Sequence, residues 1–157
     1  MKTILITGAS SGIGCALAKI YAENSHNLVL VARREEKLKD LKEELEKKHS
    51  ISVIIEVMDL SKKENLEILS LKYKNIDVLI NNAGLGQYGK FDSYNLETDI
   101  SMINLNILTP IILTKFFAKS MKSGSKIINI ASTAGFQPVP LMAIYSATKS
   151  FIVDFTL

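Results

Sequence analysis

Short apolar runs alternate along the chain with longer stretches in which apolar residues recur at helical spacing. The runs at 3–6, 28–32, 52–57, 77–80 and 126–131 predict strands. Between them, the stretch 35–49 predicts a helix with Leu38, Leu41 and Leu45 on one stripe. Strands that are apolar throughout and separated by helices are typical of parallel sheets covered on both faces. We therefore expect a doubly wound, Rossmann-like three-layer α/β/α fold with about five strands.

Further helices are predicted at 61–71, at 97–121 and from residue 143 onward. Pro110 lies inside the long middle helix and is expected to bend it. The last helix is still apolar at Phe155 and Leu157 and has neither a glycine cap nor a cationic last turn. This ending predicts a truncated helix, and a helix docked at an oligomer interface is the alternative. No repeat or linker interrupts the pattern, so residues 1–157 are expected to form one domain.

Composition narrows the classes of partner and compartment. The chain is 47% hydrophobic and 22% charged, as is typical of a globular domain, and its single cysteine excludes an internal disulfide. The net charge of +3 is small and dispersed, so nucleic acid is not an expected partner. No apolar stretch of membrane-spanning length lacks a polar interruption, and the first strand leads into glycines rather than a cleavage site. We expect a cytoplasmic protein with no membrane association and no metal site.

A glycine-rich segment follows the first predicted strand and opens the first helix. It reads Thr7-Gly8-Ala9-Ser10-Ser11-Gly12-Ile13-Gly14. In this strand–loop–helix context, backbone amides at the helix N-terminus bind a dinucleotide pyrophosphate. Gly8 permits the tight turn, Gly12 lets the backbone approach the phosphate, and Gly14 lets the helix pack closely on the strand. The segment predicts a dinucleotide site that also includes Ser10, Ser11 and Ile13.

Two arginines follow the second predicted strand, where an acidic residue would bind the ribose 2′-hydroxyl of NAD. Arg33 and Arg34 at this place suit a 2′-phosphate, so NADP is the predicted cofactor and NAD is less favoured. A solvated arginine pair that opens a charged helix is the alternative. Asp59, just after the third strand, is expected either to accept a hydrogen bond from the adenine amino group or to cap the next helix. For that cap, Ser61 is the better candidate.

Tyr145 and Lys149 are separated by one helical turn and therefore share a helix face. The phenol of a free tyrosine has a pKa of about 10 and is a poor acid or base at neutral pH. A nearby ammonium favours the phenolate and lets the phenol exchange a proton. Ser132 ends the fifth predicted strand, which brings its hydroxyl toward the start of the Tyr145 helix. The three residues predict a proton-transfer site, with a packed ring beside a solvated amine as the alternative.

Together these motifs resemble those of the short-chain dehydrogenase/reductase family, in its single-domain, NADP-preferring subclass. The resemblance covers residues 1–157 and rests on Gly8-xxx-Gly12-x-Gly14, Asn81-Asn82-Ala83-Gly84, Ser132 and Tyr145-xxx-Lys149. It implies an oxidoreductase that transfers hydride between NADP and a small carbonyl or alcohol substrate. It also implies a homodimer or homotetramer, because the predicted helices at 97–121 and from 143 onward resemble the family's dimer-forming pair.

The resemblance further implies a role for each matching residue. Tyr145 is expected to protonate the carbonyl oxygen, Lys149 to hold the nicotinamide ribose and assist Tyr145, and Ser132 to orient the carbonyl. The family's further catalytic asparagine lies on the long helix, where Asn106 is chosen over Asn104 for its distance to the Asn-Asn-Ala-Gly segment. The residues of that segment expected along the cofactor are Asn81, Ala83 and Gly84.

Members of this family normally continue beyond the Tyr–Lys helix into another strand, a Pro-Gly segment, a substrate-covering loop and a final strand. None of these follows Leu157, so the usual C-terminal substrate-binding part is expected to be missing from the chain as given. A catalytically silent nucleotide-binding or dimerising module is therefore the alternative function. A serine hydrolase is disfavoured because the chain has no Gly-x-Ser-x-Gly elbow. An apolar pocket wall is expected from residues 137–142.

Overall fold

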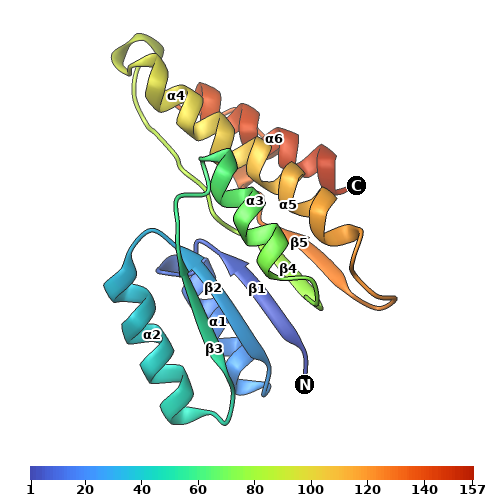
Figure 1. The fold of residues 1–157 in the computed structure, drawn as a ribbon. Coiled ribbons are helices and arrows are strands. Elements are labelled where there is room, and N and C mark those ends of the chain that lie inside the picture. Colours follow the sequence, from blue (N-terminus) through green and yellow to red (C-terminus); the bar gives the residue numbers. More distant parts are fainter.

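Five short apolar segments form one parallel sheet in the computed structural model, which describes residues 1–157 (Figure 1). The strands are β1 (Thr3–Thr7), β2 (Asn27–Ala32), β3 (Val53–Val57), β4 (Val78–Asn81) and β5 (Lys126–Asn129). Their order in the sheet is β3-β2-β1-β4-β5, and every neighbouring pair is parallel. The strand order reverses between β1 and β4, which is where ligands bind in open α/β sheets. The predicted doubly wound fold is confirmed.

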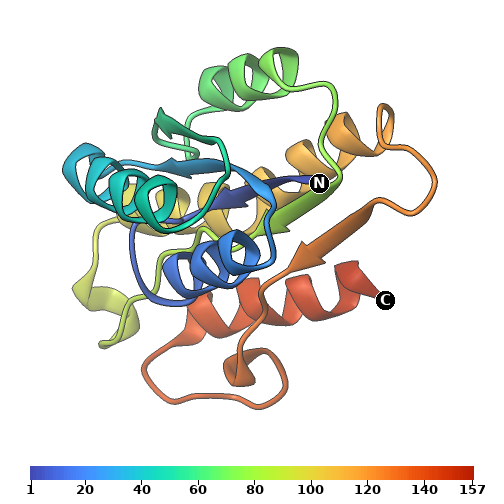
Figure 2. The same cartoon turned by 90° about the horizontal axis from the view of Figure 1, so that it is seen from below.

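Helices cover both faces of this sheet. They are α1 (Gly12–Glu23), α2 (Glu35–Lys48), α3 (Lys63–Lys72), α4 (Leu96–Ile103), α5 (Thr109–Ala118) and α6 (Ala143–Thr156). Two short 3₁₀ turns, η1 (Phe91–Ser93) and η3 (Thr133–Gly135), lie in the loops before α4 and α6. The α6 helix packs against η3 and against the long α4–α5 run. Seen from below, α3 and α6 lie on opposite sides of the view, with the strands between them (Figure 2).

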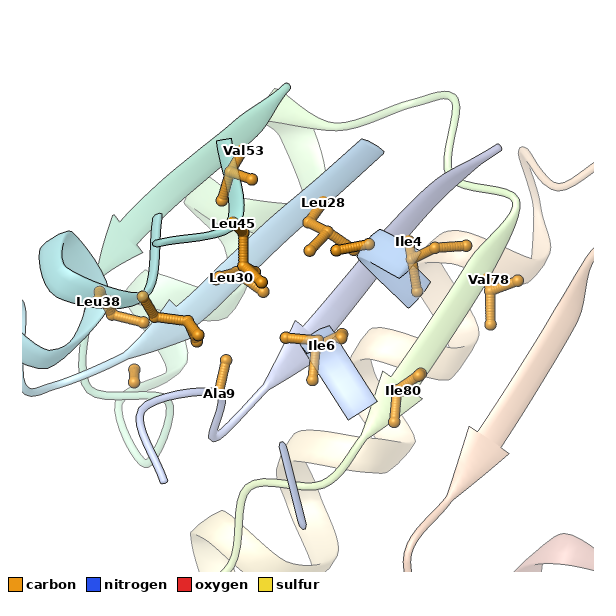
Figure 3. Close-up of a cluster of buried hydrophobic side chains, with 14 residues drawn as sticks. Ile4, Ile6, Ala9, Leu28, Leu30, Leu38, Leu45, Val53, Val78 and Ile80 are labelled. Carbon is orange, nitrogen blue, oxygen red and sulfur yellow. The ribbon is translucent and has the colours of Figure 1, made fainter. Parts of the chain in front are cut away.

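Two apolar clusters, one on each face of the sheet, hold the layers together. In the first, alternate residues of β1, β2 and β4 meet the stripe of α2 that contains Leu38, Leu41 and Leu45 (Figure 3). In the second, the opposite residues of the same strands meet α3 and α5, where Leu113 and Phe117 are buried. The apolar runs that form β1, β2 and β4 are therefore buried on both sides, which explains why these strands show no polar alternation.

The long helix predicted at 97–121 is regular only at its two ends. Between α4 and α5 lies a π turn, η2 (Asn104–Leu108), in which the Thr109 N–H donates to the Asn104 carbonyl. Pro110 comes just after this turn and has no N–H to donate to Asn106, four residues earlier. The helix thus accommodates the proline by widening one turn before it, and this wide turn carries Asn106 toward the site.

The continuous helical run Leu96–Ala118 is long and apolar enough to cross a membrane by length and composition alone. This is weak evidence, because the core helix of a globular domain meets the same criterion. Here the run packs on the sheet through Leu113 and Phe117, which are each at most 1% exposed.

Candidate functional site

A cleft of about 660 Å³ lies beyond the carboxyl ends of the strands. The loop after each of the five strands contributes to its walls, and α6 contributes Tyr145 and Lys149. Of the residues predicted to bind cofactor, all but Gly12, Gly14 and Asn81 line this cleft. The topology therefore brings together segments that are far apart in the sequence.

The glycine-rich loop is shaped by close contacts rather than by flexibility. Gly8 has a φ of +67°, and a Cβ there would lie 2.8 Å from the Ala83 Cα. A Cβ on Gly14 would lie 2.4 Å from the Gly8 carbonyl oxygen and 2.5 Å from Asn82 Nδ2. No side chain caps the N-terminus of α1. Its first amides are therefore free to donate to an anionic group in the cleft.

Two residues that the sequence did not single out fix this loop against β4. The buried Thr7 hydroxyl accepts hydrogen bonds from the N–H groups of Asn82 and Ala83, at 3.0 and 2.9 Å, and donates to the Ile80 carbonyl. The Asn82 amide donates to the carbonyls of Thr7 and Gly8. The sequence indicates these contacts only by placing a polar residue at the end of each of two apolar strands.

Asn81, by contrast, points away from the cleft. Its amide donates to Asn129 of β5 at 2.8 Å and to Thr114 of α5 at 3.3 Å. The side chain therefore ties two strands and a helix together and does not line the cleft. Its neighbour Asn82 is the member of the pair that lines the cleft.

Arg33 and Arg34 lie on the cleft wall next to the glycine loop. The Arg34 guanidinium donates to Ser10 Oγ at 3.0 Å and also to Ser11 Oγ. Neither arginine forms an ion pair within the chain, so both positive charges remain available to an anion. Guanidinium groups beside free helix amides suit a phosphate.

Asp59 faces the same wall and is bound locally. Its carboxylate accepts from the Ser61 N–H at 3.0 Å and from the Ser61 hydroxyl at 2.8 Å. Burial raises the pKa of Asp59, but these hydrogen bonds and the nearby Arg33 charge outweigh burial and hold its pKa below the ordinary value. The prediction that Ser61 caps α3 is wrong, because Ser61 is engaged with Asp59 and Lys62 occupies the cap position.

Lys149 is buried beside Tyr145 on α6. The residue as a whole is 6% exposed. Its ammonium donates to the Ile130 carbonyl at 2.8 Å and lies 5.9 Å from the centre of the Tyr145 ring. Burial lowers the pKa of Lys149 below its ordinary 10.5. The Tyr145 ring is also close to Gly86, where a Cβ would lie 3.2 Å from the ring. The pair thus lies at the cleft floor in a fixed orientation.

Asn106 connects the Tyr145 helix to the loop after β4. Its Oδ1 accepts from the Leu85 N–H at 2.8 Å, and its amide donates to the Leu85 carbonyl at 2.8 Å and to Thr148 Oγ at 3.0 Å. The Thr148 hydroxyl in turn donates to the Tyr145 carbonyl. The side chain of Asn106 is 3% exposed and fully hydrogen bonded. It therefore positions neighbours and has no free donor for a ligand.

Ser132 lies at the start of η3, where its hydroxyl accepts from the Ala134 N–H at 3.2 Å. It lines neither the main cleft nor the smaller cavity beyond Tyr145. That smaller cavity has a volume of about 240 Å³ and shares Gln87, Met142 and Tyr145 with the cleft. Of the predicted pocket wall at 137–142, only Leu141 and Met142 line it.

Chemically, this arrangement combines an anion cradle, two guanidinium groups that form no ion pair and a phenol beside a buried ammonium. The first two fit the phosphates of a dinucleotide, and the glycines keep the backbone open to it. The phenol and the ammonium can exchange a proton with a group bound at the cleft floor.

Comparison with known proteins gives a consistent result. The family model for short chain dehydrogenase matches residues 2–157. The chain is 37% identical over 161 residues to the 11-beta-hydroxysteroid dehydrogenase-like 4A protein of Arabidopsis thaliana, covering 98% of the chain and 54% of that relative. The chain thus spans about half the length of this curated relative.

Solved structures match over almost the whole chain. The bulky-bulky ketone specific alcohol dehydrogenase from Comamonas testosteroni is similar with a TM-score of 0.94 and 35% identity, over 99% of this chain and 65% of that one. A short-chain dehydrogenase from Sphingobium yanoikuyae in complex with NADPH also has a TM-score of 0.94, with 37% identity, over 99% of this chain and 63% of that one.

Proposed function

Because the chain belongs to the short-chain dehydrogenase family, we propose that it is an NADP-dependent oxidoreductase that interconverts a carbonyl and an alcohol. The observation that carries this proposal is the pairing of Tyr145 with the buried Lys149 at the floor of the cleft that the glycine loop and Arg34 also line. The relatives with ketone substrates and bound NADPH support it. When bound, NADPH supplies hydride to the carbonyl carbon.

The chain's own residues would supply the proton. Tyr145 donates its phenolic proton to the carbonyl oxygen, and the Lys149 ammonium stabilises the phenolate that remains. Burial, which lowers the pKa of Lys149, also makes its ammonium a better proton donor. Ser132 orients the carbonyl once its hydroxyl turns from the Ala134 N–H toward the substrate. Asn106 keeps Leu85 and the Tyr145 turn in register rather than contacting substrate.

The preference for NADP would come from the two arginines after β2. Arg34, held by Ser10 and Ser11 beside the free amides of α1, is placed to bind the 2′-phosphate, and Arg33 adds a second charge. Asp59 lies close enough to Arg33 for their charges to interact, so it keeps this wall ordered as well as offering an acceptor to the adenine.

Residues 1–157 are proposed to act as one cofactor-binding domain that pairs with a second copy. The α4–α5 run and the adjoining loop expose Ile100, Ile103, Leu108 and Phe116, all more than a third exposed. Apolar side chains gathered along one helical run are typical of an interface. Sedimentation at increasing protein concentration tests for the dimer or tetramer.

The decisive experiment follows NADPH absorbance with a panel of ketones and aldehydes. Unmodified protein should consume NADPH, and Tyr145→Phe should lower the rate by about 10²-fold or more while NADPH still binds. Tyr21→Phe, which alters a tyrosine of α1 that does not line the cleft, is the matched control. NADPH binding without turnover in the unmodified chain would refute the oxidoreductase and support a nucleotide-binding module instead.

A further inference from the structure

The segment between Leu85 and Gly89 carries a polar side-chain atom that forms no hydrogen bond within the chain. Three buried side-chain atoms in the chain lack a hydrogen-bond partner: Asn81 Oδ1, Gln87 Oε1 and Ser146 Oγ. Of these residues, Gln87 alone lines the cleft, and it also lines the adjoining 240 Å³ cavity. A buried acceptor without a donor is costly, so its presence at a cavity indicates a ligand group that satisfies it.

The backbone around Gln87 is fixed on both sides. Asn106 binds both the N–H and the carbonyl of Leu85, at 2.8 Å each. The Tyr94 hydroxyl donates to the Tyr88 carbonyl, and the Gly89 N–H donates to the Leu141 carbonyl at 2.9 Å. The loop therefore cannot shift to bring Gln87 to another partner, and rotation of the side chain itself is what would turn the buried oxygen toward a ligand in the cavity.

Close packing reinforces this restraint. A Cβ on Gly89 would lie 2.7 Å from the Tyr94 hydroxyl, and one on Gly86 would lie 3.2 Å from the Tyr145 ring. Leu141, whose carbonyl holds Gly89, has the strained φ of +64°. Strain of this kind persists where the surroundings impose it, often beside a binding site.

The 240 Å³ cavity continues the cleft past the Tyr145 ring. Eight of its twelve lining residues are hydrophobic, among them Met102, Leu141 and Ile144. An apolar cavity of about 150 Å³ holds benzene, so this one has room for a single ring with short substituents. A group bound here would lie next to the phenol that the proposed function uses as its acid.

We infer that Gln87 is a specificity-determining residue, whose carbonyl oxygen accepts a hydrogen bond from a hydroxyl group on the carbonyl substrate. The substrate class is an aryl- or alkyl-substituted ketone of about one ring that carries a hydroxyl apart from the reacting carbonyl. Its apolar part fills the 240 Å³ cavity, and its carbonyl faces Tyr145. This inference rests on the proposed function for the reacting end of the substrate.

The test measures ligand binding to the NADP⁺-loaded protein by ligand-observed NMR titration, which needs no turnover. The ligands are acetophenone and the ortho, meta and para isomers of hydroxyacetophenone and of methoxyacetophenone. At least one hydroxy isomer should bind roughly fivefold to tenfold more tightly than acetophenone, the ratio expected of one neutral hydrogen bond. Its methoxy counterpart, which has no proton to donate, should show no such gain.

Variants assign the effect to the Gln87 oxygen. Gln87→Met keeps the length of the side chain and should abolish the hydroxyl preference, whereas Gln87→Glu retains an acceptor and should preserve it. Gln137→Met is the matched control, because Gln137 is exposed and lines neither cavity. Thermal unfolding should place Gln87→Met at or above the wild-type midpoint, since the substitution removes an unpaired buried atom.

The inference is overturned if no hydroxy isomer is preferred, if the preference survives in Gln87→Met, or if none of these ketones binds. NADPH consumption with the same ketones separates this outcome from the proposed function. Turnover without a hydroxyl preference refutes the role of Gln87 alone. A Gln87-dependent preference without turnover supports the ligand site and refutes the oxidoreductase.

Discussion

Gly14→Ala tests whether the phosphate loop depends on close backbone packing. Alanine is the better helix former, by about 1 kcal/mol, so propensity alone predicts a more stable α1. The structure predicts the opposite, because the new Cβ would lie 2.4 Å from the Gly8 carbonyl oxygen and contacts under 3.0 Å are essentially never observed. The loop must therefore retreat by at least 0.6 Å, the difference between these two distances.

The free-energy cost of Gly14→Ala depends on which atoms the new Cβ would meet. The clash meets backbone at Gly8 and the Asn82 amide, which is itself bonded to the carbonyls of Thr7 and Gly8. Overpacking of this kind costs about 1–3 kcal/mol, which exceeds the propensity gain. Urea unfolding should show a net loss of up to about 2 kcal/mol, the overpacking cost less the propensity gain. NADPH affinity, followed by fluorescence titration, should fall roughly tenfold or more because the cradle amides move with the loop.

Gly124→Ala is the matched control. Gly124 has a φ of +85° and no atom within 4 Å of an added Cβ, and it lies in the turn before β5, away from the cleft. It should lose about 1–2 kcal/mol from backbone strain and retain wild-type NADPH affinity. Wild-type stability and affinity in Gly14→Ala would refute the argument from packing. An equal loss of affinity in both variants would attribute the effect to general destabilisation.

Three further substitutions test single interactions. Arg34→Gln should weaken NADPH binding by roughly tenfold to a hundredfold, as expected for the loss of a charged hydrogen bond, and leave NADH binding unchanged. Equal losses of affinity for NADPH and NADH would exclude a 2′-phosphate site at Arg34. Lys149→Met should abolish turnover yet raise stability at neutral pH. Burial lowers the pKa of Lys149 in the folded state, so the unfolded state binds more protons over the pH range between the two pKa values. The stability of the wild type should therefore rise with pH in that range. The urea midpoints of the wild type and Lys149→Met should converge near pH 10.5. Tyr73→Phe removes the hydroxyl that donates to the buried Glu56 and should cost about 1–3 kcal/mol. Burial and then Glu56 raise the pKa of Tyr73, so the stability lost in Tyr73→Phe should be constant up to about pH 10 and shrink only above that pH. A loss of stability that already shrinks at neutral pH would contradict this reasoning.

The sheet was predictable because its three inner strands, β1, β2 and β4, are buried on both faces. An uninterrupted run such as Leu28–Ala32 has no other stable place in a chain of this length, and the glycines after β1 identify the sheet edge that binds ligands. Among the predicted site residues, Tyr145 and Lys149 depend on local geometry alone for their relative placement. Tyr145 and Lys149 share a helix face whatever the rest of the fold does.

The features that sequence reasoning missed depend on contacts between distant segments. The π turn at Asn104–Leu108 is held by the Thr109 hydroxyl, which donates to the Leu60 carbonyl at 2.6 Å. The hydrogen bond between the Thr7 hydroxyl and the Asn82 N–H joins residues 75 positions apart. No local propensity encodes either contact, and Pro110 alone did not indicate the π turn that precedes it.

The wide turn also explains how the acid and the substrate wall stay in register. Asn106 is the residue of that turn whose amide reaches both Leu85, which begins the segment carrying Gln87, and Thr148, whose hydroxyl binds the Tyr145 carbonyl. A regular α-helix would rotate Asn106 away from one of these partners, because one extra residue in a turn shifts every later side chain around the axis. The irregular helix is therefore the element that sets the position of the Gln87 amide relative to the Tyr145 phenol. Specificity and proton transfer would therefore respond together to changes in η2.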